Sequence, residues 1–144
     1  MRIELLTSPF EPYTEVGDFE SAMQAGGKYG ACSVFVGSMR DFNLQDGVKS
    51  MFLEHYPGMT EGYLQRIGVE ASQRWPLLDV LILHRVGEVY PGDPIVTVAV
   101  WSAHRAAAFD ACRYIMEELK SRAPFWKKET FDQHAAWVDK NTPG

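Results

Sequence analysis

The stretch LLDVLILHRVGEVYPGDPIVTVAVWS, residues 77–102, carries the strongest fold signal in this chain. Residues 77–89 and 95–102 are rich in β-branched and apolar side chains, which is the composition of strands. YPGDP, residues 90–94, lies between them and combines proline, glycine and aspartate as turns do. The stretch therefore predicts two strands that pair antiparallel as a hairpin.

Two further strands are predicted on the N-terminal side of this hairpin. GACSVFVG, residues 30–37, has the composition of a buried strand with a glycine at each end. SMFLEHY, residues 50–56, is the second strand, and the following PGM closes it. The polar, turn-rich segment that joins them, residues 38–49, is longer than a typical hairpin loop.

One helix is predicted before the hairpin and one after it. Residues 60–75 carry apolar side chains at helical spacing, with Thr60 as the N-cap and Pro76 as the end. The second helix runs from about Ala103 to Arg122. Its predicted apolar face consists of Phe109, Cys112, Ile115, Met116 and Leu119.

The order strand, strand, helix, strand, strand, helix predicts an α+β fold in which helices cover a mostly antiparallel sheet. No linker divides the chain, so residues 1–144 are expected to form a single domain. The tail after Pro124 is expected to be irregular or extended, with Trp126 and Trp137 as its anchors.

The composition disfavours several classes of protein. Hydrophobic residues make up 46% of the 144 residues and charged residues 23%, as in ordinary globular proteins. The net charge of -5 argues against general nucleic-acid binding, which needs a basic surface. No apolar run approaches the ~20 residues that span a bilayer, and the N-terminus does not have the pattern of a signal peptide. We expect a cytoplasmic protein with Cys32 and Cys112 as buried, reduced thiols.

The second helix carries cationic side chains at both ends. Lys120 lies on the flank of the apolar face, where a lysine whose stem covers apolar surface is the simplest interpretation. His104 and Arg105 begin the helix. A cation is unfavourable at a helix N-terminus, so a bound anion would explain this placement, although a solvated first turn is the simpler interpretation.

Other cations follow strands or aromatic residues. Arg40 stands at the start of the long loop, and Lys127 and Lys128 follow two aromatic residues. Taken singly, each is an ordinary surface charge. The residues by themselves therefore indicate an anionic ligand weakly and name no reaction.

Motifs for metals and cofactors are absent from the sequence. No two histidines have i, i+4 spacing and no CxxC occurs, so a zinc site is not expected. The chain has no GxSxG, no P-loop and no GxGxxG. We therefore expect no metal and no cofactor.

Five blocks of this sequence, in this order, resemble the large, catalytic subunit of molybdopterin synthase. The resemblance extends from Ala31 to Trp137. The blocks are VFVGSMRDFN (34–43), LEHYPGM (53–59), HRVGEVYPGD (84–93), SAHRAAAFDAC (102–112) and LKSRAPFWKKE (119–129). The resemblance implies an α+β fold of the α/β hammerhead type.

The resemblance also implies a reaction and its partners. The family acts as a sulfurtransferase that converts cyclic pyranopterin monophosphate to molybdopterin by installing a dithiolene, a step of molybdenum cofactor biosynthesis. The sulfur arrives as a thiocarboxylate at the C-terminus of a small ubiquitin-like subunit. Two large subunits form a homodimer, and a small subunit at each end completes a heterotetramer.

The family's functional positions can be carried over to matching residues here. Lys120 and Lys127 are implied as catalytic. The implied substrate-binding residues are Ser38, Met39, Arg40, His104, Arg105, Lys120, Lys127, Lys128 and Glu129. A rival interpretation is a non-catalytic dimeric module that binds an anionic metabolite or a ubiquitin-like partner. The complete set of cations favours the enzyme, because a module that only binds would not need both catalytic lysines.

Overall fold

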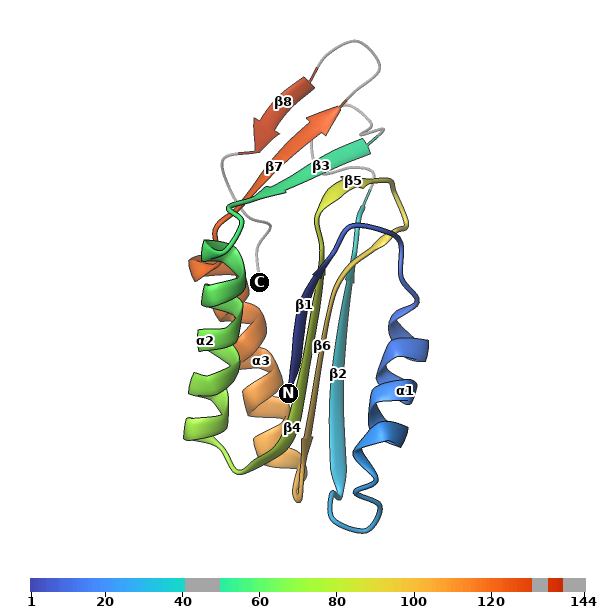
Figure 1. The fold of residues 1–144 in the computed structure, drawn as a ribbon, viewed down its shortest axis with the longest axis vertical. Coiled ribbons are helices and arrows are strands. Elements are labelled where there is room, and N and C mark those ends of the chain that lie inside the picture. Colours follow the sequence, from blue (N-terminus) through green and yellow to red (C-terminus); the bar gives the residue numbers. More distant parts are fainter. Residues whose placement is uncertain (41–49, 131–134, 139–144) are drawn as a thin grey trace.

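The computed structural model describes residues 1–40, 50–130 and 135–138, and these form two sheets and three helices (Figure 1). In chain order the elements are β1 (Arg2–Leu6), α1 (Pro12–Met23), β2 (Ala31–Ser38), β3 (Ser50–His55), α2 (Met59–Arg74), β4 (Leu77–Arg85), β5 (Gly87–Val89), β6 (Pro94–Ser102), α3 (Arg105–Arg122), β7 (Phe125–Thr130) and β8 (Ala135–Val138). The predicted α+β class is confirmed.

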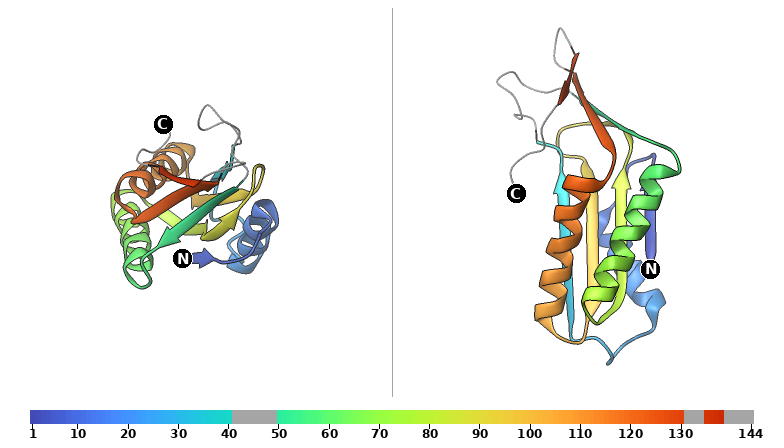
Figure 2. Two further views of the ribbon diagram at one scale, coloured as in Figure 1. Left: turned by 90° about the horizontal axis from the view of Figure 1, so that it is seen from above. Right: turned by 90° about the vertical axis from the view of Figure 1, so that its left-hand side faces the viewer.

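The first sheet has the strand order β1-β4-β6-β2. β4 and β6 pair antiparallel, as the opening stretch predicts, and β1 adds to β4 in parallel. Helices α2 and α3 cover one face and α1 covers the other (Figures 1 and 2). Side chains of β4 alternate between the two cores, so Val80 and Ile82 pack towards α2 and α3 while Leu81 and Leu83 pack towards α1.

The second sheet has the order β5-β3-β7-β8 and lies at one end of the first (Figure 1). The chain passes from the first sheet to the second between β4 and β5. The sequence predicts residues 77–89 as one continuous strand. That prediction is wrong, because β4 ends at Arg85 and Gly87 has a φ of 90°. A backbone with positive φ suits glycine and redirects the chain. Residues 87–89 then pair with β3 instead of continuing along β6.

Thr60 is not the N-cap that the sequence predicts. α2 begins one residue earlier, with Gly58 as the N-cap, and the Glu61 carboxylate accepts from the Gly58 N–H at 3.0 Å. Thr60 is buried in the first turn. Its hydroxyl accepts from the Tyr56 N–H at 3.0 Å and donates to the Pro124 carbonyl at 3.0 Å. The residue therefore joins the start of α2 to the segment that follows α3.

Several side chains predicted as buried are exposed. β2 is an edge strand, and Phe35 on it remains 41% exposed. Phe109, assigned to the apolar face of α3, is 63% exposed, whereas the other four members of that face are buried. Cys32 also lies exposed on β2, so only Cys112 is the buried thiol that we expected. A strand at the edge of a sheet has one side without a protein neighbour from the same sheet, which composition alone does not reveal.

The two ends of the chain contain more regular structure than the sequence predicts. β1 and α1 lie in a region for which no element was expected. The tail after Pro124, expected to be irregular or extended, forms β7 and β8. Trp126 is 39% exposed, so it does not anchor the tail in the core. The side chain of Trp137 and most of the predicted 38–49 loop lie outside the described residues.

Replacing Thr60 with valine should destabilise the fold by roughly 1–3 kcal/mol. Valine keeps the shape of the side chain but leaves the Tyr56 N–H and the Pro124 carbonyl without the hydroxyl. Urea unfolding measures the difference. Thr14→Val, at an exposed position of α1, is the matched control and should change the stability by less than about 0.5 kcal/mol. Equal stability of the two variants would contradict the bridging role.

Candidate active site

The junction between α3 and β7 organises the candidate site. Ala123 has extended dihedral angles, with φ of -72° and ψ of 129°, and Pro124 cannot continue a helix. β7 begins immediately afterwards at Phe125. The Phe125 ring stacks on the imidazole of His84, with the ring centroids 3.9 Å apart and the planes at 13°. The stack fixes where β7 starts relative to β4.

Lys127 and Lys128 are neighbours in sequence but project from opposite faces of β7. Lys127 pairs with Leu53 and Lys128 pairs with Phe52. Leu53 is 1% exposed and faces the first sheet, whereas Phe52 is exposed. Because directly paired residues share a face, Lys127 points towards the interior and is half-buried, while Lys128 points outwards and is exposed.

Lys120 and Lys127 act on the same half-buried ring, that of His84. Burial is the main cause that lowers the pKa of His84 from 6.5 to about 4. A contact of Nδ1 with the Arg85 carbonyl, at 2.7 Å, works in the opposite direction. The charges of Lys127 and then Lys120 lower this pKa further. Two cations from different elements, α3 and β7, therefore lie near one imidazole.

Ser38, Met39 and Arg40 stand at the end of β2 that lies nearest the second sheet (Figure 1). Met39 is 6% exposed and packs with Met51, Leu53 and Val89. Its N–H donates to the Asp93 carbonyl, and its carbonyl accepts from the Gly92 N–H, both at 2.9 Å. Arg40 follows this fixed backbone and is exposed. Since Leu53 is also the strand partner of Lys127, this segment lies at the same end of the molecule as the two lysines.

His104 and Arg105 lie at the other end of α3. His104 is the N-cap, and both residues are exposed. Fifteen residues separate Arg105 from Lys120, which corresponds to roughly 22 Å along a helix at 1.5 Å per residue. Figure 2 shows that α3 starts at the end of the first sheet remote from β7. One copy of the chain therefore does not bring these two residues to Arg40, Lys120 and Lys127.

Glu129 belongs to β7, where its backbone pairs with Met51. Its side chain lies outside the described part of the structure. A role for Glu129 in substrate binding stays a prediction, as do the roles of the other carried-over residues.

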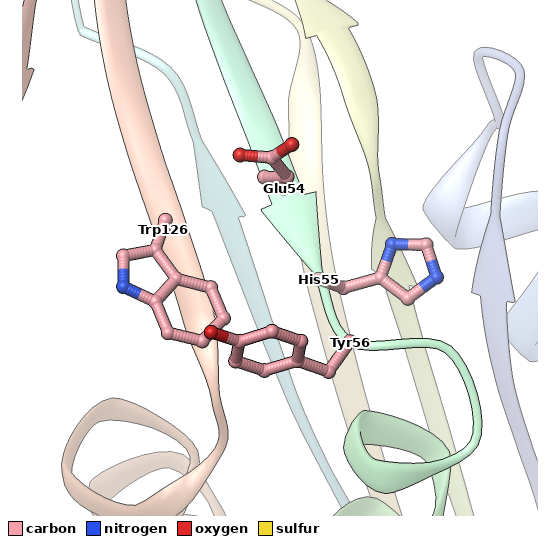
Figure 3. Close-up of a pocket in the computed structure, with 4 residues that line it drawn as sticks. All are labelled: Glu54, His55, Tyr56 and Trp126. Atoms are coloured by element: carbon pink, nitrogen blue, oxygen red, sulfur yellow. The ribbon is translucent and has the colours of Figure 1, made fainter.

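A shallow pocket of about 540 Å³ lies beside the first residues of β7 and was not predicted (Figure 3). It is lined by Glu54, His55, Tyr56 and Trp126. The rings of Tyr56 and Trp126 meet edge to face with their centroids 4.2 Å apart. Figure 3 shows His55 directed away from both rings. Of the predicted site residues whose side chains the structure describes, none lines this pocket.

Both cysteines are poorly suited to act as nucleophiles. Burial raises the pKa of Cys112 above its ordinary value. Cys32 is exposed as a residue, but desolvation of its thiol by neighbouring atoms, followed by the charges of Glu20 and Cys112, raises its pKa to about 11. The reactive form of cysteine is the thiolate, which at neutral pH is a small fraction for either residue.

The described residues contain no group of three or more His, Cys, Asp or Glu side chains that could hold a metal ion. In the same part of the chain, none of the helices combines the length and the apolar composition that a bilayer span requires.

Comparison with known proteins assigns this architecture to a family. The family model of the MoaE protein matches residues 11–122. The molybdopterin synthase catalytic subunit of Pseudomonas aeruginosa is 52% identical over 139 residues, which cover 96% of this chain and 91% of that protein.

Two solved structures have the same fold. A molybdopterin biosynthesis MoaE protein from Burkholderia ambifaria is 44% identical, with a TM-score of 0.81 over 99% of this chain and 92% of that one. A molybdopterin synthase structure from Staphylococcus aureus is 30% identical, with a TM-score of 0.85 over 96% of this chain and 97% of that one. This chain belongs to the MoaE family of molybdopterin synthase catalytic subunits.

The depressed pKa of His84 predicts a dependence of stability on pH. Between about pH 6.5 and pH 4 the unfolded chain binds a proton at His84 that the folded chain does not, so stability falls as the pH falls through this window. The loss attributable to His84 is up to about 3 kcal/mol.

Urea unfolding between pH 7 and pH 4 measures this dependence. His84→Asn should flatten it, because the variant has no imidazole to protonate. His55→Asn is the matched control and should retain the slope, because His84 is intact. An unchanged slope in His84→Asn would show that another group causes the dependence.

Proposed function

We propose that this chain is a sulfurtransferase and the catalytic subunit of a molybdopterin synthase. It moves sulfur from the C-terminal thiocarboxylate of a small ubiquitin-like subunit to cyclic pyranopterin monophosphate and so builds the dithiolene of molybdopterin. The observation that carries the proposal is that the charges of Lys120 and Lys127, from two different elements, both act on the half-buried imidazole of His84. Membership of the family supports the identity of the reaction.

Sulfur transfer requires positive charge at the place where the precursor and the sulfur donor meet. The precursor carries a cyclic phosphate and the sulfur donor is an anion, so two negative groups must approach one another. The thiocarboxylate sulfur attacks a side-chain carbon of the precursor. A C–S bond forms and a C–O bond at that carbon breaks, its oxygen leaving as water or staying on the phosphate as the ring opens, and a second thiocarboxylate delivers the second sulfur in the same way. Water then cleaves the bond between the carrier's acyl carbon and this sulfur, and the carrier leaves as a carboxylate.

Lys120 and Lys127 have distinct roles in this proposal. Lys120, exposed at the last turn of α3, stabilises the thiocarboxylate and the oxyanion that forms on its carbonyl. Lys127, half-buried beside His84, moves protons as water is lost and the phosphate ring opens. The nucleophile is the partner's sulfur, so neither cysteine of this chain needs to react.

The phosphate and the pterin are held by Arg40, His104 and Arg105, with Ser38, Met39, Lys128 and Glu129 as further contacts. Arginine suits this role because its planar guanidinium makes bidentate contacts to phosphate. The distance of roughly 22 Å along α3 prevents His104 and Arg105 from reaching Lys120 of their own chain. We therefore propose that they serve the site of a second copy, in a homodimer related by a two-fold axis.

The assembly is proposed to be a heterotetramer of two such chains and two small subunits, acting in the cytoplasm. The name of the relatives supports a further subunit, since a catalytic subunit by definition has a partner. No cofactor, nucleic acid or membrane takes part in the proposed reaction, and residues 1–144 act as one domain.

A non-catalytic dimeric module that binds an anionic metabolite or a ubiquitin-like partner is the alternative. Such a module would require surface cations to attract an anion. It would not require lysines from two different elements to act on one imidazole. The placement of Lys127 therefore favours the enzyme.

Alanine variants separate the roles of the lysines. Lys120→Ala and Lys127→Ala should each lower kcat by about 10²–10⁴ in an assay with thiocarboxylated small subunit and precursor. Lys128→Ala should have a smaller effect than Lys127→Ala, because its side chain projects from the opposite face of β7. Lys28→Ala, at an exposed position before β2, is the control. Turnover of Lys120→Ala and Lys127→Ala close to that of the parent protein would refute the catalytic assignment.

Mixing two inactive variants tests the shared site. Lys127→Ala and Arg105→Ala should each be inactive alone, but equal amounts of the two, unfolded and refolded together, should recover about a quarter of the parent turnover. Half of the dimers are then mixed, and in each of those one site combines both intact residues. No recovery, with mixed dimers verified by mass spectrometry, would mean that Arg105 serves its own chain.

A further inference from the structure

His84 is held in a defined orientation by contacts on two sides. It lies near the end of β4, paired with Leu5 of β1 and Val96 of β6. Phe125 stacks on one face of its ring at 3.9 Å. At the ring edge, Nδ1 lies 2.7 Å from the Arg85 carbonyl oxygen. A ring fixed by a stack and a hydrogen bond has a fixed direction for its remaining nitrogen.

The contact with Arg85 determines the tautomer of this imidazole. A carbonyl oxygen only accepts hydrogen bonds, so Nδ1 must carry the proton and donate it. Burial and the two nearby ammonium groups keep the ring neutral at physiological pH, with a pKa of about 4. In a neutral imidazole with a proton on Nδ1, Nε2 is a lone-pair acceptor.

Among the described residues, the charged groups that lower the pKa of this ring are two lysines. Lys127 follows Phe125 by two residues, so both side chains leave the same face of β7, the face that lies against His84. Lys120 approaches from the last turn of α3. The neighbouring positions on β1 and β6, Leu5 and Val96, are apolar. A neutral acceptor therefore lies beside Phe125, against the face of β7 from which Lys127 also projects.

We propose that His84 is a positioning residue of the sulfur-transfer site, whose Nε2 accepts a hydrogen bond from the ammonium group of Lys127 and directs it towards the substrate. This inference rests on the proposed function of Lys127. It adds a residue that the sequence marks only as a histidine in a predicted strand.

A neutral imidazole suits this position better than the alternatives. A protonated histidine would place a third positive charge beside the two lysines and repel both. A general base with a pKa of about 4 would hold a proton too weakly to accept one from lysine at neutral pH. His84 therefore acts by holding Lys127 in place and does not itself exchange protons with the substrate.

Three variants at this position separate its contacts. His84→Gln places an amide oxygen near the position of Nε2 and retains an acceptor for Lys127. His84→Asn places its amide near Nδ1, so it can still donate to the Arg85 carbonyl but has no hydrogen-bond acceptor at the position of Nε2 for Lys127. His84→Phe keeps a ring to stack on Phe125 and has no acceptor. His55→Phe, whose backbone pairs with Phe125 from β3, is the matched control.

Two measurements are made on each variant. The first is the pKa of the Lys127 side chain in the protein without substrate, from the pH dependence of its modification by an amine-selective reagent, read by mass spectrometry. The second is kcat and KM for sulfur transfer. Because an acceptor stabilises the charged ammonium, the proposal predicts that His84→Asn and His84→Phe lower the pKa of Lys127, while His84→Gln and His55→Phe leave it near the parent value.

In the same series, His84→Asn and His84→Phe should lose about ten- to a hundredfold in kcat with KM nearly unchanged. His84→Gln should stay within about tenfold of the parent protein. A Lys127 pKa that is the same in all folded variants would overturn the proposal, whatever the turnover. Absence of sulfur transfer by the parent protein would instead refute the proposed function, while the pKa measurement would still test the contact.

Discussion

The stacking of Phe125 on His84 is the contact on which the arrangement of the site depends. It joins the first residue of β7 to the end of β4 and so connects the second sheet to the first. The Thr60 hydroxyl reinforces the same junction through the Pro124 carbonyl. Since strand residues alternate in direction, fixing Phe125 also fixes the side from which Lys127 leaves. The stack thereby converts two adjacent lysines into one interior charge and one surface charge.

The length of α3 imposes the second constraint. The helix carries His104 and Arg105 at its start and Lys120 in its last turn, so residues predicted for one ligand lie at opposite ends of one rigid element. The proposed pairing of two copies about a two-fold axis would resolve the conflict, because the start of one α3 could then lie beside the end of the other. β2, an edge strand with exposed Val34 and Phe35, offers apolar surface that such a dimer would cover.

Much of the fold follows from local patterns in the sequence, and the features that these patterns do not predict have identifiable physical causes. Period and composition predict the β4–β6 pair and helices α2 and α3, because these elements form the main core. The same patterns are wrong at Gly87, where a positive φ directs residues 87–89 into the second sheet, and at Phe109, which has the helical spacing of the apolar face but is exposed.

For the site, the two lysines were predicted from the resemblance to a family and not from their spacing in the sequence. His84 was missed because its partners come from β7 and α3, far away in sequence.

We propose that the cations at the α3–β7 junction perform sulfur transfer and do not merely bind an anion. The direct measurement mixes the purified chain with thiocarboxylated small subunit and cyclic pyranopterin monophosphate and analyses the products by mass spectrometry. We expect a dithiolene product that carries two sulfurs, with the carrier recovered as its carboxylate. Precursor that is bound but chemically unchanged, with the thiocarboxylate intact, would refute sulfur transfer by this chain and establish a binding module instead.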